Sequence, residues 1–292
     1  MATFGQWVEG ARLRTLPIAI SSVIGGWAAA VFLGRFSPAP AVLAMVVALA
    51  LVVGVNFSND YSDGIRGSDG ADRVGPLRLV GSGAAEPGTV RAAAFGCYGV
   101  AGLAGLAIVI LTGQWWLLVV GVACVLAAWF YTGGKHPYGY AGLGEIFVFI
   151  FFGLVAVCGT AFVTAGAVDA ATVVTSVIFG LLACGVLVAN NLRDIDGDRV
   201  SGKRTLATRL GHGGTRVLYV LLVVLGAAGV VAVAVLTSWW ALLGLVMVIF
   251  MIGPVRAMVT GASGMVLVKA LRDTGFAELG CSLGLLAGAL LG

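Results

Sequence analysis

The sequence has few charged residues. Asp, Glu, Lys and Arg make up only 10% of its 292 residues, whereas they make up about a quarter of an ordinary soluble domain. Apolar types make up 60%, and the mean hydropathy is +1.06. So few charged side chains cannot cover so much apolar surface in water. The composition therefore excludes a soluble globular protein, a disordered chain and a secreted disulfide scaffold, and it predicts a protein whose solvent is lipid.

Cysteine and histidine are also scarce. The 5 cysteines lie singly inside apolar runs, without the paired spacing of a disulfide framework or a metal site. The only 2 histidines, His136 and His212, are far apart in the sequence. The residues therefore give no indication of a zinc centre or of disulfides.

Long apolar runs are the main positive feature. About nine of them reach the roughly 20 residues that a helix needs to cross a bilayer, and none shows the alternation of barrel strands. We therefore expect an all-α multi-pass bundle that forms a single domain over residues 1–292, its 45 glycines allowing close helix packing. The basic segment 255–273 is expected to lie along the membrane surface or to cap a cavity. The predicted spans are 15–34, 39–57, 91–112, 115–131, 144–166, 171–190, 214–236, 238–254 and 274–291.

The positive charges fall in alternate loops. With nine spans and an inside N-terminus, every Lys and Arg except Arg35 lies in the chain's cytoplasmic parts. This is the positive-inside pattern. The net charge of +4 is thus a topology signal, and we expect a protein of the bacterial inner membrane that binds no nucleic acid.

Two clusters of Asn and Asp lie at cytoplasmic helix ends. At 100° per residue, the members of each cluster share one face of a helix. Asp196 points away from the second face. The first cluster is Asn56, Asn59, Asp60 and Asp63, after the second span, and the second cluster is Asn190, Asn191, Asp194 and Asp198, after the sixth.

Such clusters are compatible with solvated helix ends or with a binding site. Acids near membrane depth are costly and favour a water-filled or ion-filled cavity. Their oxygens suit Mg²⁺, which shares its coordination shell with substrate phosphates. Basic residues beyond both clusters, including Arg66, Lys203 and Arg204, would neutralise the remaining phosphate charge. We therefore favour a site for a magnesium-bound diphosphate.

These motifs carry a resemblance to a known family. The chain resembles the UbiA superfamily of intramembrane aromatic prenyltransferases over about residues 7–280, and most closely the branch that prenylates 1,4-dihydroxy-2-naphthoate. That superfamily often has a third Asp where this chain has Gly67, and Asp69 is a candidate substitute. The motifs that match are 12–17, 59–64, 66–69, 72–76, 131–132, 137–140, 190–195, 202–206 and 209–211.

The resemblance implies nine helices around a cavity open near the cytoplasmic face, and a reaction. An all-trans polyprenyl diphosphate would alkylate 1,4-dihydroxy-2-naphthoate with loss of CO₂ and diphosphate, giving a demethylmenaquinol for menaquinone biosynthesis. Mg²⁺ would be the cofactor, and membrane lipid would surround the protein. The implied metal ligands are Asn56, Asp60, Asp63, Asp194 and Asp198; the implied diphosphate ligands are Arg66, Lys135, Lys203 and Arg204; the pocket candidates are Asn59, Tyr61, Asp69, Arg78, Tyr131, Tyr138, Asn190 and Asn191.

Several alternatives stay open at this point. The acceptor could be a hydroxybenzoate, homogentisate or haem, and the aligned acids could instead belong to a cation-coupled transporter. A CDP-alcohol phosphotransferase motif begins at Asp60, but Gly67 stands where that motif requires Ala. The tyrosines could be interfacial anchors rather than cavity residues. Glu145, at the start of the fifth span, either complements a helix dipole or takes part in catalysis.

Overall fold

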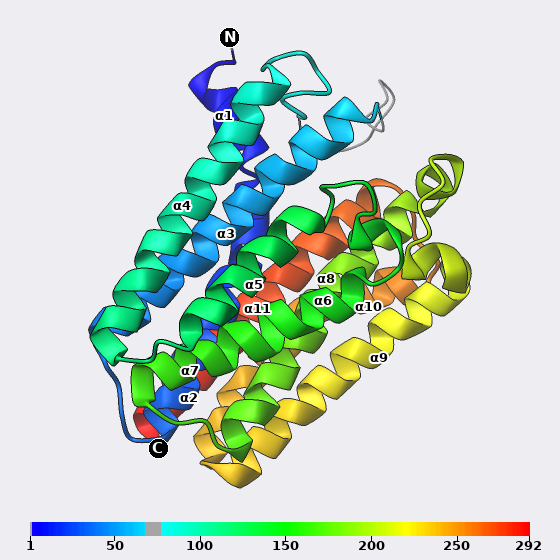
Figure 1. Cartoon of the computed structure of the whole chain (residues 1–292). Coiled ribbons are helices and arrows are strands. Elements are labelled where there is room, and N and C mark those ends of the chain that lie inside the picture. The colour runs from blue at the N-terminus through cyan, green and yellow to red at the C-terminus, as the bar shows by residue number, and fades with distance from the viewer. Residues whose placement is uncertain (1, 68–76) are drawn as a thin grey trace. The chain divides into compact units, whose positions relative to one another are not determined.

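The structure is a computed structural model that describes residues 2–67 and 77–292 (Figure 1). The described residues form helices, turns and loops, and no strand. Eight helices are long and apolar enough to cross a membrane, and a shorter apolar helix spans Leu117–Phe130. The predicted all-α multi-pass fold is therefore confirmed. Of the predicted site residues, Asp69 lies outside the described residues.

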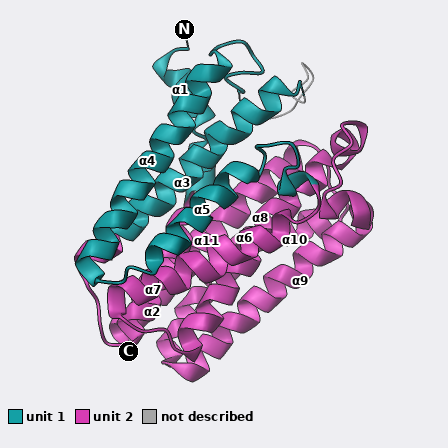
Figure 2. Ribbon diagram, in the orientation of Figure 1, with its two compact units in different colours: residues 1–16, 43–140 teal, residues 17–42, 141–292 magenta. Residues whose placement is uncertain are grey.

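The chain divides into two compact units (Figure 2). Unit 1 consists of Met1–Leu16 and Leu43–Tyr140, and unit 2 consists of Pro17–Val42 and Ala141–Gly292. The first predicted cluster belongs to unit 1 and the second to unit 2. That the chain is a single domain stays a prediction.

Unit 1 is built from α1 (Phe4–Gly10), most of α3 (Pro38–Ile65), α4 (Pro87–Thr112) and α5 (Leu117–Phe130). Local sequence sets several of these bounds. Thr3 and Gln6 form a capping box at the start of α1, and Gly113, at φ 69°, ends α4 in the left-handed region. The buried core of this unit comprises Phe57, Leu79, Val90 and Ala94.

Unit 2 contains the larger helical core. A continuous stretch of α6, a π-helical segment and α7 precedes the long helix α8, the most buried of the candidate spans. Asp169 caps α8 by accepting a hydrogen bond from the backbone N–H of Thr172. The elements are α2 (Leu16–Phe32, in this unit from Pro17), α6 (Gly144–Val148), the π-helix (Phe149–Cys158), α7 (Gly159–Ala165), α8 (Ala170–Val200), α9 (Leu206–Leu236), a 3₁₀ helix (Trp239–Val246), α10 (Met247–Val259) and α11 (Met265–Leu291).

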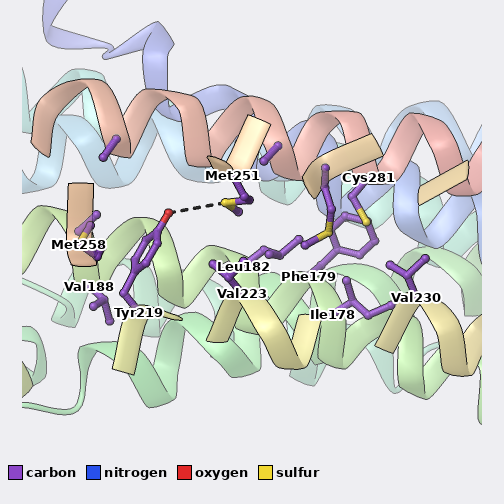
Figure 3. Packing of buried hydrophobic residues seen from close by; sticks show 14 of the residues in the cluster. Ile178, Phe179, Leu182, Val188, Tyr219, Val223, Val230, Met251, Met258 and Cys281 are labelled. Carbon is purple, nitrogen blue, oxygen red and sulfur yellow. Dashed lines mark hydrogen bonds between the residues drawn. The ribbon is translucent and has the colours of Figure 1, made fainter. Parts of the chain in front are cut away.

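The core of unit 2 packs α8 against its neighbours (Figure 3). Phe179 and Leu182 of α8 are buried among side chains of α9, α10 and α11. The Tyr219 hydroxyl of α9 meets the Met251 sulfur at 3.6 Å and the Thr274 hydroxyl at 2.5 Å. These contacts satisfy a buried hydroxyl and join α9 to α10 and α11, the helices that pack around α8. Helix α8 carries the second cluster at its C-terminal end.

One predicted boundary, the start of the last span at 274, was wrong, because that helix begins at Met265. The segment 255–273 is no separate surface or capping element, because α10 runs to Val259 and α11 begins at Met265. The basic residues of segment 255–273 lower the local hydropathy, but they lie within α10 and α11. Helix α9 consists of two helical segments that meet at a kink, because Gly211 (φ 69°, ψ 178°) leaves helical geometry. The longer, apolar segment after the kink begins close to the predicted residue 214.

Candidate active site

Asp60 is the most deeply buried member of the first cluster. Its side chain is 0% exposed. One carboxylate oxygen accepts the backbone N–H of Leu79 at 2.8 Å, and the other accepts that of Val80 at 2.9 Å. Each carboxylate oxygen keeps a further lone pair after it accepts one N–H, so these contacts leave room for a metal ion. Asp60 anchors the segment that follows the undescribed residues, and its role as a metal ligand stays a prediction.

Asp63 is the acid of this cluster with side-chain partners. Its Oδ2 lies 3.0 Å from the Arg78 guanidinium in a buried ion pair, and its Oδ1 accepts the Tyr140 hydroxyl. Burial and the nearby Asp63 charge raise the pKa of Tyr140, so that hydroxyl stays protonated and can donate. Arg78, a pocket candidate, thus forms an ion pair with Asp63, a predicted metal ligand.

The two amides of the first cluster are also engaged. Asn56 is buried, and its Nδ2 donates to the Ala11 carbonyl and to the Thr15 hydroxyl, both at 2.9 Å. Asn56 therefore joins α3 to the N-terminal segment. One of its partners, Thr15, belongs to the opening motif 12–17. Asn59 accepts the Thr132 hydroxyl at 2.7 Å.

Arg66 holds the loop that follows α5. Its guanidinium donates to the carbonyls of Thr132 and Gly134, each at 2.5 Å, and lies 5.5 Å from the centre of the Tyr140 ring. Lys135 follows in the same loop and is exposed. The predicted diphosphate ligands of unit 1 are therefore close in the fold, although 69 positions separate them in the sequence.

The tyrosine candidates of unit 1 form two aromatic contacts. Tyr61 stacks on Trp129, with ring centres 6.1 Å apart, and carries the Arg91 guanidinium over its ring. Tyr131 meets Tyr138 edge to face at 5.5 Å. The Tyr138 hydroxyl donates to the Ala127 carbonyl at 2.7 Å, and burial raises its pKa. These rings serve packing; their predicted role in a substrate pocket stays a prediction.

The second cluster lies at the end of α8 in unit 2. Arg193 donates to both carboxylate oxygens of Asp194, at 2.7 and 2.6 Å, and to the Asn190 amide oxygen at 3.0 Å. The Asp194 side chain is 32% exposed, so a ligand can reach it. Sequence reasoning missed Arg193, because a basic residue beside an acid gives no directional signal of its own.

The residues after Asp198 form a basic cavity. The turn closes when the Asp198 carbonyl accepts the Lys203 backbone N–H at 2.9 Å. A cavity of about 430 Å³ follows, with two predicted diphosphate ligands among its four cationic side chains. Its lining consists of Arg199, Gly202, Lys203, Arg204, Thr208 and Arg209. The arrangement suits a multiply charged anion such as a diphosphate.

Glu145 of α6 joins the second cluster through Asn191. Its Oε1 accepts the Asn191 amide at 3.0 Å, and its backbone carbonyl accepts the Cys184 thiol at 3.1 Å. The Glu145 side chain is buried at 9% exposure. The two contacts fix this acid against α8 at the level of the pocket candidate Asn191.

The donor chemistry of both clusters fits Mg²⁺ in part. Asp194 and Asp198 offer carboxylate oxygens that are not fully buried, and Asp63 offers one balanced by Arg78. Asp60 is buried and already accepts two backbone N–H groups, which leaves it fewer lone pairs for an ion. The described residues contain no group of three or more His, Cys, Asp or Glu that could hold an ion by themselves. Mg²⁺ would thus require further oxygen ligands, such as those of a phosphate.

The family model described as the UbiA prenyltransferase family matches residues 19–264. The chain belongs to the UbiA prenyltransferase family. It is 51% identical to a 1,4-dihydroxy-2-naphthoate octaprenyltransferase of Mycobacterium tuberculosis, over 99% of this chain and 98% of the relative. It is also 40% identical to the Escherichia coli protein of the same name, over 72% and 70% of the two chains.

Solved UbiA homologues share the fold. The apo structure of one from Aeropyrum pernix aligns with a TM-score of 0.71 at 17% identity, over 94% of this chain and 97% of the other. One from Archaeoglobus fulgidus, bound to DMAPP and Mg²⁺, aligns with a TM-score of 0.62 at 13% identity, over 94% and 99%. In this chain the two clusters lie on α3 and α8, two of its long helices.

Proposed function

We propose that this UbiA prenyltransferase transfers an all-trans polyprenyl group from its diphosphate to 1,4-dihydroxy-2-naphthoate. Carbon dioxide and diphosphate leave, and the product is a demethylmenaquinol of menaquinone biosynthesis. The observation that best supports binding of the diphosphate substrate is the basic cavity after Asp198, which adjoins the acids of α8. The choice of 1,4-dihydroxy-2-naphthoate as the acceptor is supported by the similarity to naphthoate octaprenyltransferases, which covers 99% of this chain for one relative and 72% for another.

Each unit contains candidate diphosphate ligands. Lys203 and Arg204 line the basic cavity of unit 2, and Arg66 and Lys135 flank the α5 loop of unit 1. Guanidinium groups match phosphate oxygens with two parallel hydrogen bonds. Each cation neutralises part of the charge that grows on the leaving diphosphate, which lowers the barrier to breaking the allylic C–O bond.

The candidate Mg²⁺ ligands, which would act together with the substrate phosphates, are Asn56, Asp60 and Asp63 in unit 1 and Asp194 and Asp198 in unit 2. When bound, the metal acts as a Lewis acid that stabilises the departing diphosphate. Arg193 orients the Asp194 carboxylate before the substrate binds. Arg78 does the same for Asp63, and the protonated Tyr140 hydroxyl adds a second donor.

The acceptor ring attacks the prenyl carbon as the C–O bond breaks. The ring carbon that carries the carboxylate forms the new C–C bond, and the C–CO₂ bond then breaks with its electrons returning to the ring. Water must be excluded from the reactive carbon until that step. The long apolar helices supply such a setting for the prenyl chain, which is itself a hydrocarbon.

The site is expected to face the cytoplasm of a bacterial inner membrane. The proposal rests on the positive-inside distribution of Lys and Arg. Both clusters adjoin loops that are rich in basic residues, whereas Arg35 lies in a loop on the opposite side. Cysteine labelling of intact cells tests it: a cysteine introduced at Lys135 should react only after the cells are opened, while one introduced at Arg35 should react in intact cells.

An acceptor competition tests the function. The protein, purified in detergent with Mg²⁺ and a polyprenyl diphosphate, receives equal amounts of 1,4-dihydroxy-2-naphthoate, 4-hydroxybenzoate and homogentisate, and mass spectrometry identifies the products. The proposal expects the prenylated, decarboxylated naphthoquinol to dominate. Prenylated hydroxybenzoate or homogentisate in its place would overturn the acceptor while leaving prenyl transfer intact. No prenylated product from any acceptor would overturn the reaction.

A further inference from the structure

One buried acid of unit 2 has no part in the diphosphate chemistry described above. Glu145 lies within an apolar span, where an ionisable side chain is costly unless it has a use. Among the described residues, the side chain that donates to its carboxylate is the neutral Asn191 amide, and no Lys or Arg forms an ion pair with it. Helix-end electrostatics alone does not require burial of the side chain.

The backbone packing fixes the depth of Glu145. The π-helical segment after α6 lies directly against α8: a Cβ on Gly153 would meet the Ser176 carbonyl oxygen at 2.6 Å and the Gly180 Cα at 2.7 Å. Together with the Cys184 contact, this holds Glu145 in register with Asn191. The position of the acid is therefore a property of two closely packed helical segments.

That depth is where the acceptor ring must react. Asn191 lies on the same face of α8 as Asp194 and Asp198, but closer to the middle of the helix by about 4.5 and about 10.5 Å. A diphosphate held at those acids and at the basic cavity places its reactive carbon on the membrane side of its phosphates. A ring that attacks this carbon lies at the level of Asn191 and Glu145.

We propose that the Glu145 carboxylate accepts a hydroxyl hydrogen of the acceptor ring and takes its proton during attack. This inference rests on the proposed function. It makes Glu145 a catalytic residue, whereas Asn191 is a positioning residue that orients the carboxylate. The acceptor class that Glu145 selects is a hydroxyaryl ring with the hydroxyl next to the attacking carbon.

In the proposed reaction Glu145 takes one proton from the acceptor ring and later returns it. As the ring carbon forms its bond to the prenyl carbon, the neighbouring C–OH becomes C=O and its proton moves to the carboxylate. The electron pair of the breaking allylic C–O bond leaves with the diphosphate. When the C–CO₂ bond breaks, its electrons regenerate the ring oxyanion, which takes the proton back from Glu145. The residue ends ionised and ready for another turnover.

The test compares Glu145→Gln with Glu145→Asp. The Gln side chain keeps the size and an oxygen for Asn191 but cannot take a proton. We expect its kcat to fall by about 100-fold or more near neutral pH, with unchanged affinity for the polyprenyl diphosphate. The Asp variant should recover a measurable part of the loss. Glu278→Gln is the matched control, because it neutralises another buried acid of unit 2 and should keep the wild-type rate.

A pH series separates a base from a structural residue. The loss in Glu145→Gln should shrink as the pH approaches about 10, where a phenolic hydroxyl ionises by itself. Among the described residues, the Cys184 thiol of α8 lies against Glu145, and Glu278 of α11 lies near the same thiol; neither changes in the variant. A deficit that is constant with pH, a Gln variant near the wild-type rate, or an Asp variant no better than Gln would each overturn the proposal.

The result also separates this inference from the proposed function. If the wild type prenylates naphthoate and Glu145→Gln does so equally well, only the role of Glu145 fails. If the wild type prenylates a different hydroxyaryl acceptor instead, the acceptor assignment fails and the same comparison is made on that acceptor.

Discussion

Arg193 binds both carboxylate oxygens of Asp194, the next residue along α8, at 2.7 and 2.6 Å. A metal ion that binds Asp194 must therefore share this carboxylate with a guanidinium or displace it. A displaced Arg193 is free to bind the phosphates that arrive with the metal. The ion pair thus orients the Asp194 carboxylate until the substrate takes the place of the guanidinium.

Asp194→Asn should abolish turnover without unfolding the protein. We expect a rate loss of about 100-fold or more, because a ligand to the diphosphate-bound metal loses its charge. Stability should change by less than about 1 kcal/mol, since the Asp194 side chain is one-third exposed and such ion pairs contribute little. Product formation and thermal unfolding in detergent, measured on the same preparation, check both statements. Normal turnover would remove Asp194 from the site.

Asp60→Asn should behave in the opposite way. The introduced amide group would face a backbone N–H of Leu79 or Val80 in a fully buried position. A lost hydrogen bond with a buried donor left unsatisfied costs about 1–3 kcal/mol. The thermal midpoint should therefore fall clearly, and activity should fall with the folded fraction. If the midpoint is unchanged while Mg²⁺ dependence is lost, Asp60 is a metal ligand after all.

Asp60 shows what the sequence could and could not predict. The helical spacing correctly placed Asn56, Asn59, Asp60 and Asp63 at the end of one long helix. Helical spacing does not predict which of these side chains will bind a backbone segment elsewhere in the chain. The hydrogen bonds from Leu79 and Val80 to Asp60 join positions about 20 residues apart. The sequence alone therefore gave no sign that Asp60 anchors a backbone segment.

The limits of hydropathy appear at α11. Lys269, Arg272 and Asp273 lowered the average and led to a predicted start at 274, although the helix begins at Met265. A helix can carry charged residues at an end without ending there. The two-unit arrangement likewise has no signal in the sequence, because both units use the same Leu, Val, Ala and Gly-rich helices.

Tyr140→Phe should weaken the Asp63 cluster. It removes the hydroxyl that donates to Asp63, and a hydrogen bond to a charged group contributes about 1.5–3 kcal/mol. Because the pKa of Tyr140 is raised in the fold, the protonated form is favoured there, and its contribution to stability is lost only as the pH rises above about 10. Unfolding measured between about pH 7 and about pH 10 should therefore show a constant difference from the wild type. A difference that disappears well below that range would contradict the assignment of Tyr140 as donor.

Glu278→Met should stabilise the protein. Glu278 is fully buried in α11, and among the described residues neither of its carboxylate oxygens has a hydrogen-bond partner. Replacing it with an apolar side chain of similar length removes a desolvation penalty of about 1–3 kcal/mol. The thermal midpoint should rise while prenyl transfer continues at the wild-type rate. A lower midpoint or a lost activity would show that Glu278 has a partner during function.

The most direct test of the account follows the carboxyl carbon of the acceptor. Purified protein, polyprenyl diphosphate and Mg²⁺ are mixed with 1,4-dihydroxy-2-naphthoate labelled in its carboxyl group, and released CO₂ is counted against released diphosphate. The account predicts one CO₂ for each diphosphate and no release of either when EDTA removes the metal. Folded protein that prenylates the naphthoate but retains the label, or that releases CO₂ without Mg²⁺, would contradict it.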